Sequence, residues 1–254
     1  IGNEILKDFL FIVLNTESFE VSVESLAKGL AQQNISAEQI ESIKIPIPPK
    51  DVQEKIVSEI KKIESKNEKL FNQIQKLENQ IKNYLTSSVK SKEKKIGDIL
   101  TLEYGSALTE GDRVSGEYPV MGSNGVVGYH NKFIVKGPTI IVGRKGSAGK
   151  VTWIDKDNYP IDTTFYVKKN NEEVDYKFLY YVLRDINLEN LALGAGVPGL
   201  NRNDVYNQTY KLPPPDEQQI IMVQIIKIEK QIFKLNQELR VIKNKKSEIL
   251  KKYF

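Results

Sequence analysis

Two long stretches of the chain place apolar residues at alternating spacings of four and three. The first covers residues 50–90 and the second covers residues 216–254, and neither contains glycine or proline. Sustained four-three spacing without helix breakers is typical of coiled-coil helices, so we predict one long helix in each stretch. The seam positions of the first helix are Ile56, Ile60, Ile63, Asn67, Leu70, Ile74, Leu77, Ile81 and Tyr84. Those of the second are Ile221, Ile225, Ile228, Ile232, Leu235, Leu239, Ile242, Lys246 and Ile249.

The two seams are copies of each other at an offset of 165 residues. The offset also places Pro48–Gln53 over residues 213–218, and with a further gap of four residues it places Phe9 over Phe178. Residues 1–90 therefore repeat residues 166–254, and we expect the chain to hold the back half of one unit followed by one whole unit. Because both seams lie in one chain, we expect the helices to pair with each other; a zipper with another chain is the alternative.

Between the helices, glycine-rich and β-branched segments predict an α+β globular domain. Strands are expected at 138–143, 150–154, 162–168 and 209–212, with short helices at 176–186 and from about Asn201. The expected division is 1–49 as the end of a first domain, 50–90 as a central helix, 91–215 as a complete second domain and 216–254 as a C-terminal helix.

Composition narrows the chemistry of this chain. It has no cysteine and a single histidine, His130, which argues against disulfides, thiol or Ser-His-Asp catalysis, and metal sites built from cysteine or histidine. No apolar run is long enough to span a membrane, so we expect a cytoplasmic protein with no membrane partner. We expect His130 to lie in a loop or at the surface and Asp155, Asp157 and Asp162 to lie in a turn between strands.

The total net charge of +4 conceals an uneven distribution. Residues 50–95 hold 12 basic and 7 acidic side chains, and residues 216–254 hold 9 and 5. Residues 96–215 hold 13 basic and 14 acidic side chains, yet the window 118–154 inside them has five basic residues and no acid. An acid-free basic window suits contact with phosphate, because carboxylates would repel it.

The order of these elements resembles the specificity subunits of Type I restriction–modification systems. The resemblance covers the whole chain and depends on three features: the Pro-Pro-x-x-x-Gln openings of both long helices, Leu193-Gly194-x-Gly196-x-Pro198-x-Leu200, and the domain start Lys95-Ile96-Gly97-Asp98-Ile99 with its later glycine-rich segments. The first target-recognition domain departs from the family pattern because its front half is missing.

The resemblance implies a DNA-reading subunit without catalysis or a cofactor of its own. In this family each target-recognition domain reads half of a bipartite site in double-stranded DNA, and the two spacer helices pack as an antiparallel coiled coil that sets the half-site spacing. The expected partners are DNA methyltransferase (modification) subunits and a motor-nuclease (restriction) subunit. If the first domain is naturally truncated, two copies of the chain are expected to associate and rebuild two readers. The polar seam residues Asn67 and Lys246 either fix helix register or extend into solvent.

Candidate DNA contacts come from the basic window and the loops around it. Glycine-rich segments allow backbone N–H groups to approach phosphate, arginine pairs with guanine and asparagine with adenine. A plain hairpin turn at 123–125 and a solvated surface at Arg144 and Lys150 are the structural alternatives. The candidate residues are Ser106, Arg113, Ser123, Asn124, Tyr129, Lys132, Arg144, Lys145, Ser147 and Lys150.

Other functions are less consistent with the residues. Arg144 stands where a Walker A loop requires its first glycine, and Val151 follows Lys150 where that loop requires serine or threonine. We find no catalytic cluster, no metal ligands and no cofactor motif. Two alternatives stay open: a coiled-coil adaptor that binds protein instead of DNA, and the recognition module of a fused restriction–methylation enzyme.

Overall fold

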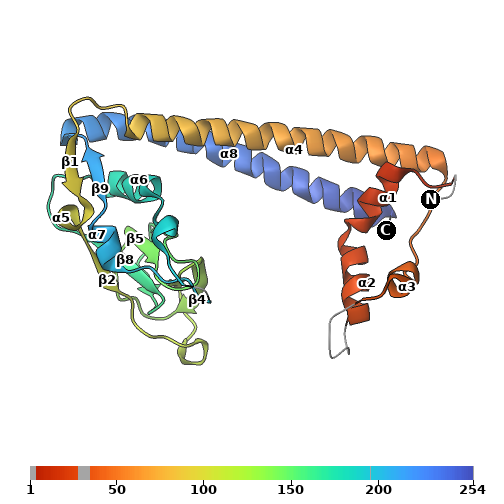
Figure 1. The fold of residues 1–254 in the computed structure, drawn as a ribbon, viewed down its shortest axis with the longest axis horizontal. Helices are drawn as coiled ribbons and strands as arrows, with labels where there is room; N and C mark the ends of the chain where they lie inside the picture. The colour runs from red at the N-terminus through yellow and green to blue at the C-terminus, as the bar shows by residue number, and fades with distance from the viewer. Residues whose placement is uncertain (1–3, 28–34, 195, 254) are drawn as a thin grey trace. The chain divides into compact units, whose positions relative to one another are not determined.

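A computed structural model describes residues 4–27, 35–194 and 196–253. The chain divides into two compact units, which are described separately. Unit 1 comprises Ile1–Glu78 with Glu229–Phe254, and unit 2 comprises Asn79–Ile228. The division falls inside the two long helices α4 (Lys50–Leu85) and α8 (Pro215–Tyr253), which are labelled in Figure 1.

The part of unit 1 that the structure describes consists of helices joined by turns and irregular segments, without strands. Three short helices, α1 (Lys7–Leu14), α2 (Glu17–Ala27) and α3 (Ala37–Glu41), precede α4. Helix α3 begins with a capping box, in which the Ser36 hydroxyl accepts from the Gln39 N–H and the Gln39 side chain accepts from the Ser36 N–H. These bonds satisfy two donors that an uncapped helix leaves without partners.

The parts of α4 and α8 in unit 1 pack antiparallel along the predicted seams. Ile56 and Ile60 lie in a cluster with Ile249, whereas Ile63 and Leu70 lie in a cluster with Ile242. Early residues of one helix thus meet late residues of the other, which confirms the antiparallel coiled coil expected from the resemblance. Leu235 and Leu239 are partly buried against the second cluster.

The two polar seam positions behave differently. Lys246 extends its Nζ to Glu64 Oε1 at 2.7 Å, an exposed ion pair between the two helices. Asn67 is half-buried, and its Oδ1 atom is buried with no hydrogen-bond partner. A buried acceptor without a partner lowers stability, so Asn67 costs free energy in this seam.

Helix α4 ends at Leu85, five residues before the expected boundary at 90. The Thr86 N–H still makes a helical bond to Lys82 O, whereas the Ser87 N–H and hydroxyl both donate to Tyr84 O, only three residues back. Such local bonds from hydroxyl residues compete with a continued helix. The chain then enters strand β1 (Lys92–Lys95), the first strand of unit 2.

Unit 2 contains three small sheets. A four-stranded antiparallel sheet has the order β2 (Leu100–Tyr104), β8 (Thr164–Lys169), β5 (Thr139–Gly143) and β6 (Val151–Ile154). A second sheet has the order β4 (Gly125–His130), β3 (Tyr118–Gly122) and β7 (Tyr159–Pro160). The third pairs β1 (Lys92–Lys95) antiparallel with β9 (Thr209–Leu212).

Short helical segments connect these strands. They are α5 (Ile96–Ile99), η1 (Glu110–Asp112), α6 (Tyr176–Ile186), η2 (Leu188–Leu191) and α7 (Arg202–Tyr206). The predicted strands at 138–143, 150–154, 162–168 and 209–212 and the helix at 176–186 are confirmed to within two residues. No helix among the described residues is sufficiently long and apolar for a membrane crossing.

The core of unit 2 lies between the four-stranded sheet, α6 and the ends of the long helices. Its buried cluster includes Leu102, Ile140 and Phe165 from the sheet and Phe178, Leu179 and Val182 from α6. The seam residues Ile221 and Ile225 are buried in the same cluster, and Ile81 packs against it. This end of each seam therefore packs against the domain as well.

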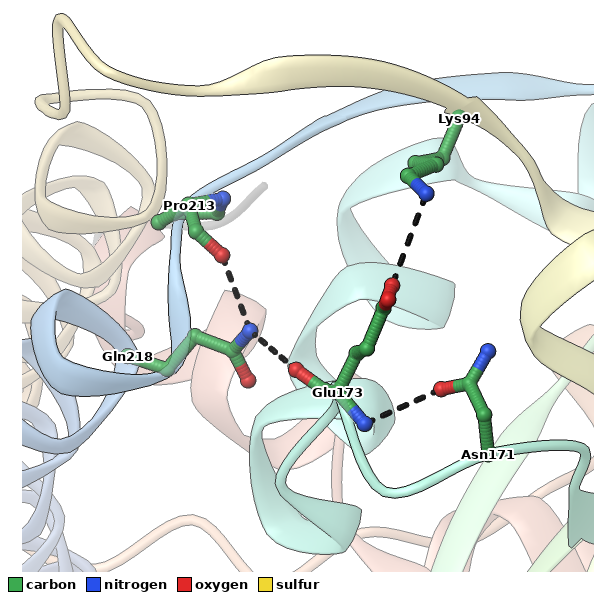
Figure 2. A network of polar contacts seen from close by, with 5 residues as sticks. All are labelled: Lys94, Asn171, Glu173, Pro213 and Gln218. Carbon is green, nitrogen blue, oxygen red and sulfur yellow. Dashed lines mark hydrogen bonds and ion pairs between the residues drawn. The ribbon is translucent and has the colours of Figure 1, made fainter.

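One buried glutamine at the start of each long helix makes the same three hydrogen bonds in both copies of the repeat. Gln218 donates from Nε2 to the Pro213 and Glu173 carbonyls, both at 2.9 Å (Figure 2). Its Oε1 accepts from the Asp175 N–H at 2.9 Å. Figure 2 also shows the side chain of Glu173 reaching Lys94 in β1.

In unit 1, Gln53 donates to the Pro48 and Glu4 carbonyls at 2.8 and 2.9 Å and accepts from the Leu6 N–H at 2.8 Å. The prolines and glutamines are 165 residues apart, and the other partners are 169 apart. This agrees with the four-residue gap inferred from the sequence. We call each set the glutamine clamp, because it ties the start of a short helix (α1 or α6) to the start of a long one.

Candidate nucleic-acid interface

The loop from Gly143 to Lys150 joins β5 to β6 and is held by its own backbone. The N–H groups of Gly143, Ala148, Gly149 and Lys150 donate to carbonyls inside the loop. Those of Arg144 and Lys145 donate to Thr163 O, and that of Gly146 donates to Pro198 O. These donors are therefore engaged within the protein. The expectation that glycines here offer backbone N–H groups to phosphate is wrong for these positions. Any contact of this loop with phosphate is therefore left to its side chains.

Gly149 sets the path of this loop. Its φ of +85° lies in the left-handed region, and a Cβ atom there would lie 2.4 Å from backbone atoms of Leu188 and Glu189 in η2. Only glycine fits both conditions. The loop thus rests directly on the backbone of η2 while its outer residues, Lys145 and Ser147, are exposed.

The guanidinium group of Arg144 is held at the start of this loop. Its Nε donates to Asp162 O at 2.9 Å, and its Cζ lies 5.3 Å from the centroid of the Tyr104 ring. The Cζ of Arg202 lies 5.2 Å from the same ring centroid. Tyr104 ends β2 and Arg202 begins α7, so three separate elements bring one aromatic ring and two cations together.

Arg202 lies outside the predicted candidates, and Tyr104 opens the stretch 104–113, which the sequence indicates only weakly as a DNA contact. The sequence contained a weak signal for each, since Tyr104 precedes the glycine of a Tyr-Gly-Ser segment and Arg202 follows the Gly-x-Gly-x-Pro-x-Leu segment. That second segment contacts the Arg144 loop directly. The Leu200 N–H donates to Arg144 O at 2.9 Å, and Lys145 forms an isolated antiparallel β-bridge with Gly199.

The turn between β3 and β4 packs against the same loop. The Ser123 hydroxyl lies 2.6 Å from Lys145 O and 2.8 Å from Thr163 O, and it donates to these carbonyls. Lys150 Nζ donates to Asn124 Oδ1 at 2.6 Å and to Asn124 O at 3.1 Å. The hairpin alternative for 123–125 is confirmed, and Ser123, Asn124 and Lys150 join the turn to the loop. Their contact with DNA stays a prediction.

The other candidates lie along the β3–β4 hairpin or the segment before it. Arg113 donates from Nη1 to Val127 O at 2.7 Å, and its Nε is buried with no hydrogen-bond partner. Tyr129 and Lys132 are exposed at and just beyond the end of β4. Ser106 is exposed, and its N–H donates to Pro160 O at 3.0 Å. Arg113 thus has a structural contact, whereas Tyr129, Lys132 and Ser106 present free surface.

His130 is buried, so the expectation of a loop or surface residue is wrong. It ends β4 opposite Tyr118, its Nδ1 accepts from the Val114 N–H at 3.0 Å, and its ring meets Tyr159 edge-on at 5.6 Å. The two partners give it a structural role. In the part of the chain that the structure describes, no group of three acidic or histidine side chains is arranged to hold a metal.

Comparisons with known proteins agree with this architecture. The model of the Type I restriction modification DNA specificity domain matches residues 2–79 and 88–249. The S subunit of a Type I restriction–modification system from M. genitalium is similar in structure, with a TM-score of 0.61, 19% identity, and coverage of 99% of this chain and 73% of that one.

The HsdS subunit from Thermoanaerobacter tengcongensis gives a TM-score of 0.52 at 15% identity, with 97% of this chain and 69% of that one covered. A chain from a structural study of complex assembly in the Type I R-M system gives 0.58 at 12% identity, covering 96% and 68%. No curated protein sequence matches significantly. At these identities the solved structures establish the fold, whereas the family match covers most of the sequence. The chain belongs to the family of Type I restriction modification DNA specificity domains.

Proposed function

We propose that this chain is a non-catalytic subunit of a Type I restriction–modification complex, in which residues 91–215 read one half of a bipartite site in double-stranded DNA. The observation that carries the proposal is the meeting of the acid-free 143–150 loop, the 122–125 turn and the Tyr104 ring with Arg144 and Arg202. Exposed cations and an aromatic ring on loops held by a sheet match what phosphate contact and base reading require.

The first test compares two exposed lysines in a gel-shift titration over a range of salt concentrations. Lys145→Ala removes a cation from the loop, so the affinity should fall for all DNA sequences and the salt slope should decrease by about one. Lys156→Ala is the control, because Lys156 is exposed between two aspartates. Equal effects of the two substitutions would contradict the placement of the interface. Absence of DNA binding by the complex would favour the adaptor alternative.

We propose further that the paired helices set the distance between the two half-sites. The antiparallel packing in unit 1 and the ion pair between Lys246 and Glu64 support a rod whose length is set by helix geometry. One heptad inserted after Asn67 and one after Ile242 keeps both seams in phase and adds about 10 Å. That length corresponds to about three base pairs, so the methylated motif should gain about three positions in its gap.

The matched control places the same seven residues after Ser88, outside both helices, and should leave the gap unchanged. The gap is measured by sequencing the methylated motifs in DNA from cells that carry each complex. An unchanged gap in the double-heptad variant would refute the ruler role.

Residues 1–49 are proposed to be the C-terminal part of a first recognition domain. The repeated glutamine clamp supports this, as do positions whose burial differs between the copies. Leu14 is 42% exposed whereas its counterpart Leu183 is fully buried, and Ile40 is 45% exposed whereas Val205 is fully buried. In unit 2 these positions belong to the core that contains the four-stranded sheet, whereas residues 4–27 and 35–49, as the structure describes them, hold no strand.

The proposed partners are methyltransferase subunits on the helices and a motor-nuclease subunit for restriction. Ile220, Val223 and Ile226 on α8 are exposed apolar residues consistent with a protein contact. The mass and stoichiometry of the purified complex test this assembly. They also distinguish it from self-associated copies of the chain and from a fused restriction–methylation enzyme.

A further inference from the structure

Arg144 is the most firmly held cation at the candidate interface. Its backbone N–H donates to Thr163 O and its carbonyl accepts from Leu200, both at 2.9 Å, so the main chain is fixed on both sides. Its side chain is fixed at two further points, through Nε to Asp162 O and through the Tyr104 ring. A guanidinium held in this way loses little conformational entropy when it binds a ligand.

The way Arg144 is held determines which of its donors are left for a ligand. Because Nε is bonded to a carbonyl, the two terminal nitrogens, Nη1 and Nη2, form the free end of the fork. Two parallel N–H donors match the O6 and N7 acceptors that guanine presents in the major groove. Adenine presents one acceptor and one donor at these positions and does not match the pair.

Tyr104 and Arg202 have different relations to this group. The Tyr104 ring is 50% exposed and packs on Phe165, with ring centroids 5.1 Å apart, so it offers a supported flat face to Arg144. Among the described residues, the guanidinium of Arg202 has a ring contact but no hydrogen-bond partner. Arg202 is thus less constrained in direction than Arg144.

We infer that Arg144 reads a guanine in the half-site, that Tyr104 is the positioning residue for its guanidinium, and that Arg202 adds affinity without base preference. This inference depends on the proposed function, since it requires residues 91–215 to bind DNA. It names one base pair, G·C, as a fixed element of the recognised half-site.

The experiment selects bound half-sites from a DNA pool randomised at every position, using the methyltransferase complex that contains this chain. The wild-type complex should enrich an invariant G·C pair at one position. Arg144→Ala and Arg144→Lys should lose discrimination there by about 5- to 150-fold and keep the other positions, because each lacks the planar fork. Arg202→Ala should weaken binding to all sequences evenly.

The Tyr104 variants separate positioning from folding. Tyr104→Ala should relax preference at the same base pair as Arg144→Ala, whereas Tyr104→Phe keeps the ring and should retain the preference. If the wild-type complex prefers G·C at one position and both Arg144 variants keep that preference, the role of Arg144 is refuted while the proposed function stands. A wild-type complex with no sequence preference would overturn the proposed function itself. Arg144→Lys keeps the charge and provides the result if Arg144→Ala does not fold.

Discussion

Replacing Gln218 by alanine should destabilise unit 2 far more than the loss of a polar side chain at the molecular surface would. The side chain is fully buried and makes three hydrogen bonds to backbone groups of Glu173, Asp175 and Pro213. At about 1 kcal/mol net for each bond, the loss is about 3 kcal/mol. For a unit of this size that corresponds to a decrease in the melting temperature of roughly 6–12 °C.

The single tryptophan makes this prediction measurable within unit 2. Trp153 lies against Tyr176 and Tyr180 of α6, with ring centroids 5.8 and 5.9 Å apart, and the clamp holds Asp175, the N-cap of that helix. Tryptophan fluorescence during heating therefore reports on the region that Gln218 supports, whereas far-UV circular dichroism follows all helices.

Two further variants sharpen the test. Gln219→Ala changes the exposed neighbour and should shift stability by no more than about 0.5 kcal/mol. Gln218→Glu would place an ionised carboxylate against two carbonyl oxygens, so it should be less stable at pH 7 than Gln218→Ala. It should recover part of that stability as the pH is lowered and the carboxyl group takes up a proton. Equal melting temperatures for Gln218→Ala and Gln219→Ala would refute the reasoning.

Three other predictions follow from single positions. Gly149→Ala should lower the melting temperature more than Gly146→Ala, since both have positive φ but only Gly149 meets backbone at 2.4 Å; equal effects in calorimetry would contradict this. Asn67→Leu should raise the free energy of unfolding by about 1–3 kcal/mol in urea titrations, because it removes a buried acceptor without a partner, and lower stability would argue that the asparagine has a partner. Burial, with the nearby Asp185, raises the pKa of Tyr210, so its stabilising contribution is complete below about pH 10 and is lost as the pH rises further. Tyr210→Phe should weaken that alkaline loss in pH-dependent denaturation, and an unchanged loss would assign it to other groups.

Much of the architecture could be predicted from the order of residues. The four-three spacing from Ile56 to Ile81 predicted α4, and the 165-residue repeat predicted a matching helix α8. The four-residue gap in the repeat, inferred from the Phe9 and Phe178 segments, reappears in the partners of the two clamps. These features are local or periodic, so they can be recognised in the amino-acid sequence without the fold.

The candidate interface was only partly predictable. The acid-free window identified the loop that holds Arg144, because charge is visible in the sequence. Contacts then changed the roles of individual residues: Lys150 reaches Asn124, the loop N–H groups bond within the protein, and His130 is buried. None of these outcomes follows from residue type, since each depends on which polar group the fold brings within hydrogen-bond distance.

The sequence by itself determined the long helices, their repeat, four of the nine strands described in the second domain and the basic loop, because each is expressed in local spacing or composition. Only the tertiary structure brought together Tyr104, Arg144 and Arg202, which lie on β2, after β5 and on α7. Intervals of 40 and 58 residues separate them along the chain, and no periodicity spans such intervals. Strand pairing in the sheet and the bonds between the 193–200 segment and the Arg144 loop bring them to one place, so their meeting is a property of the fold.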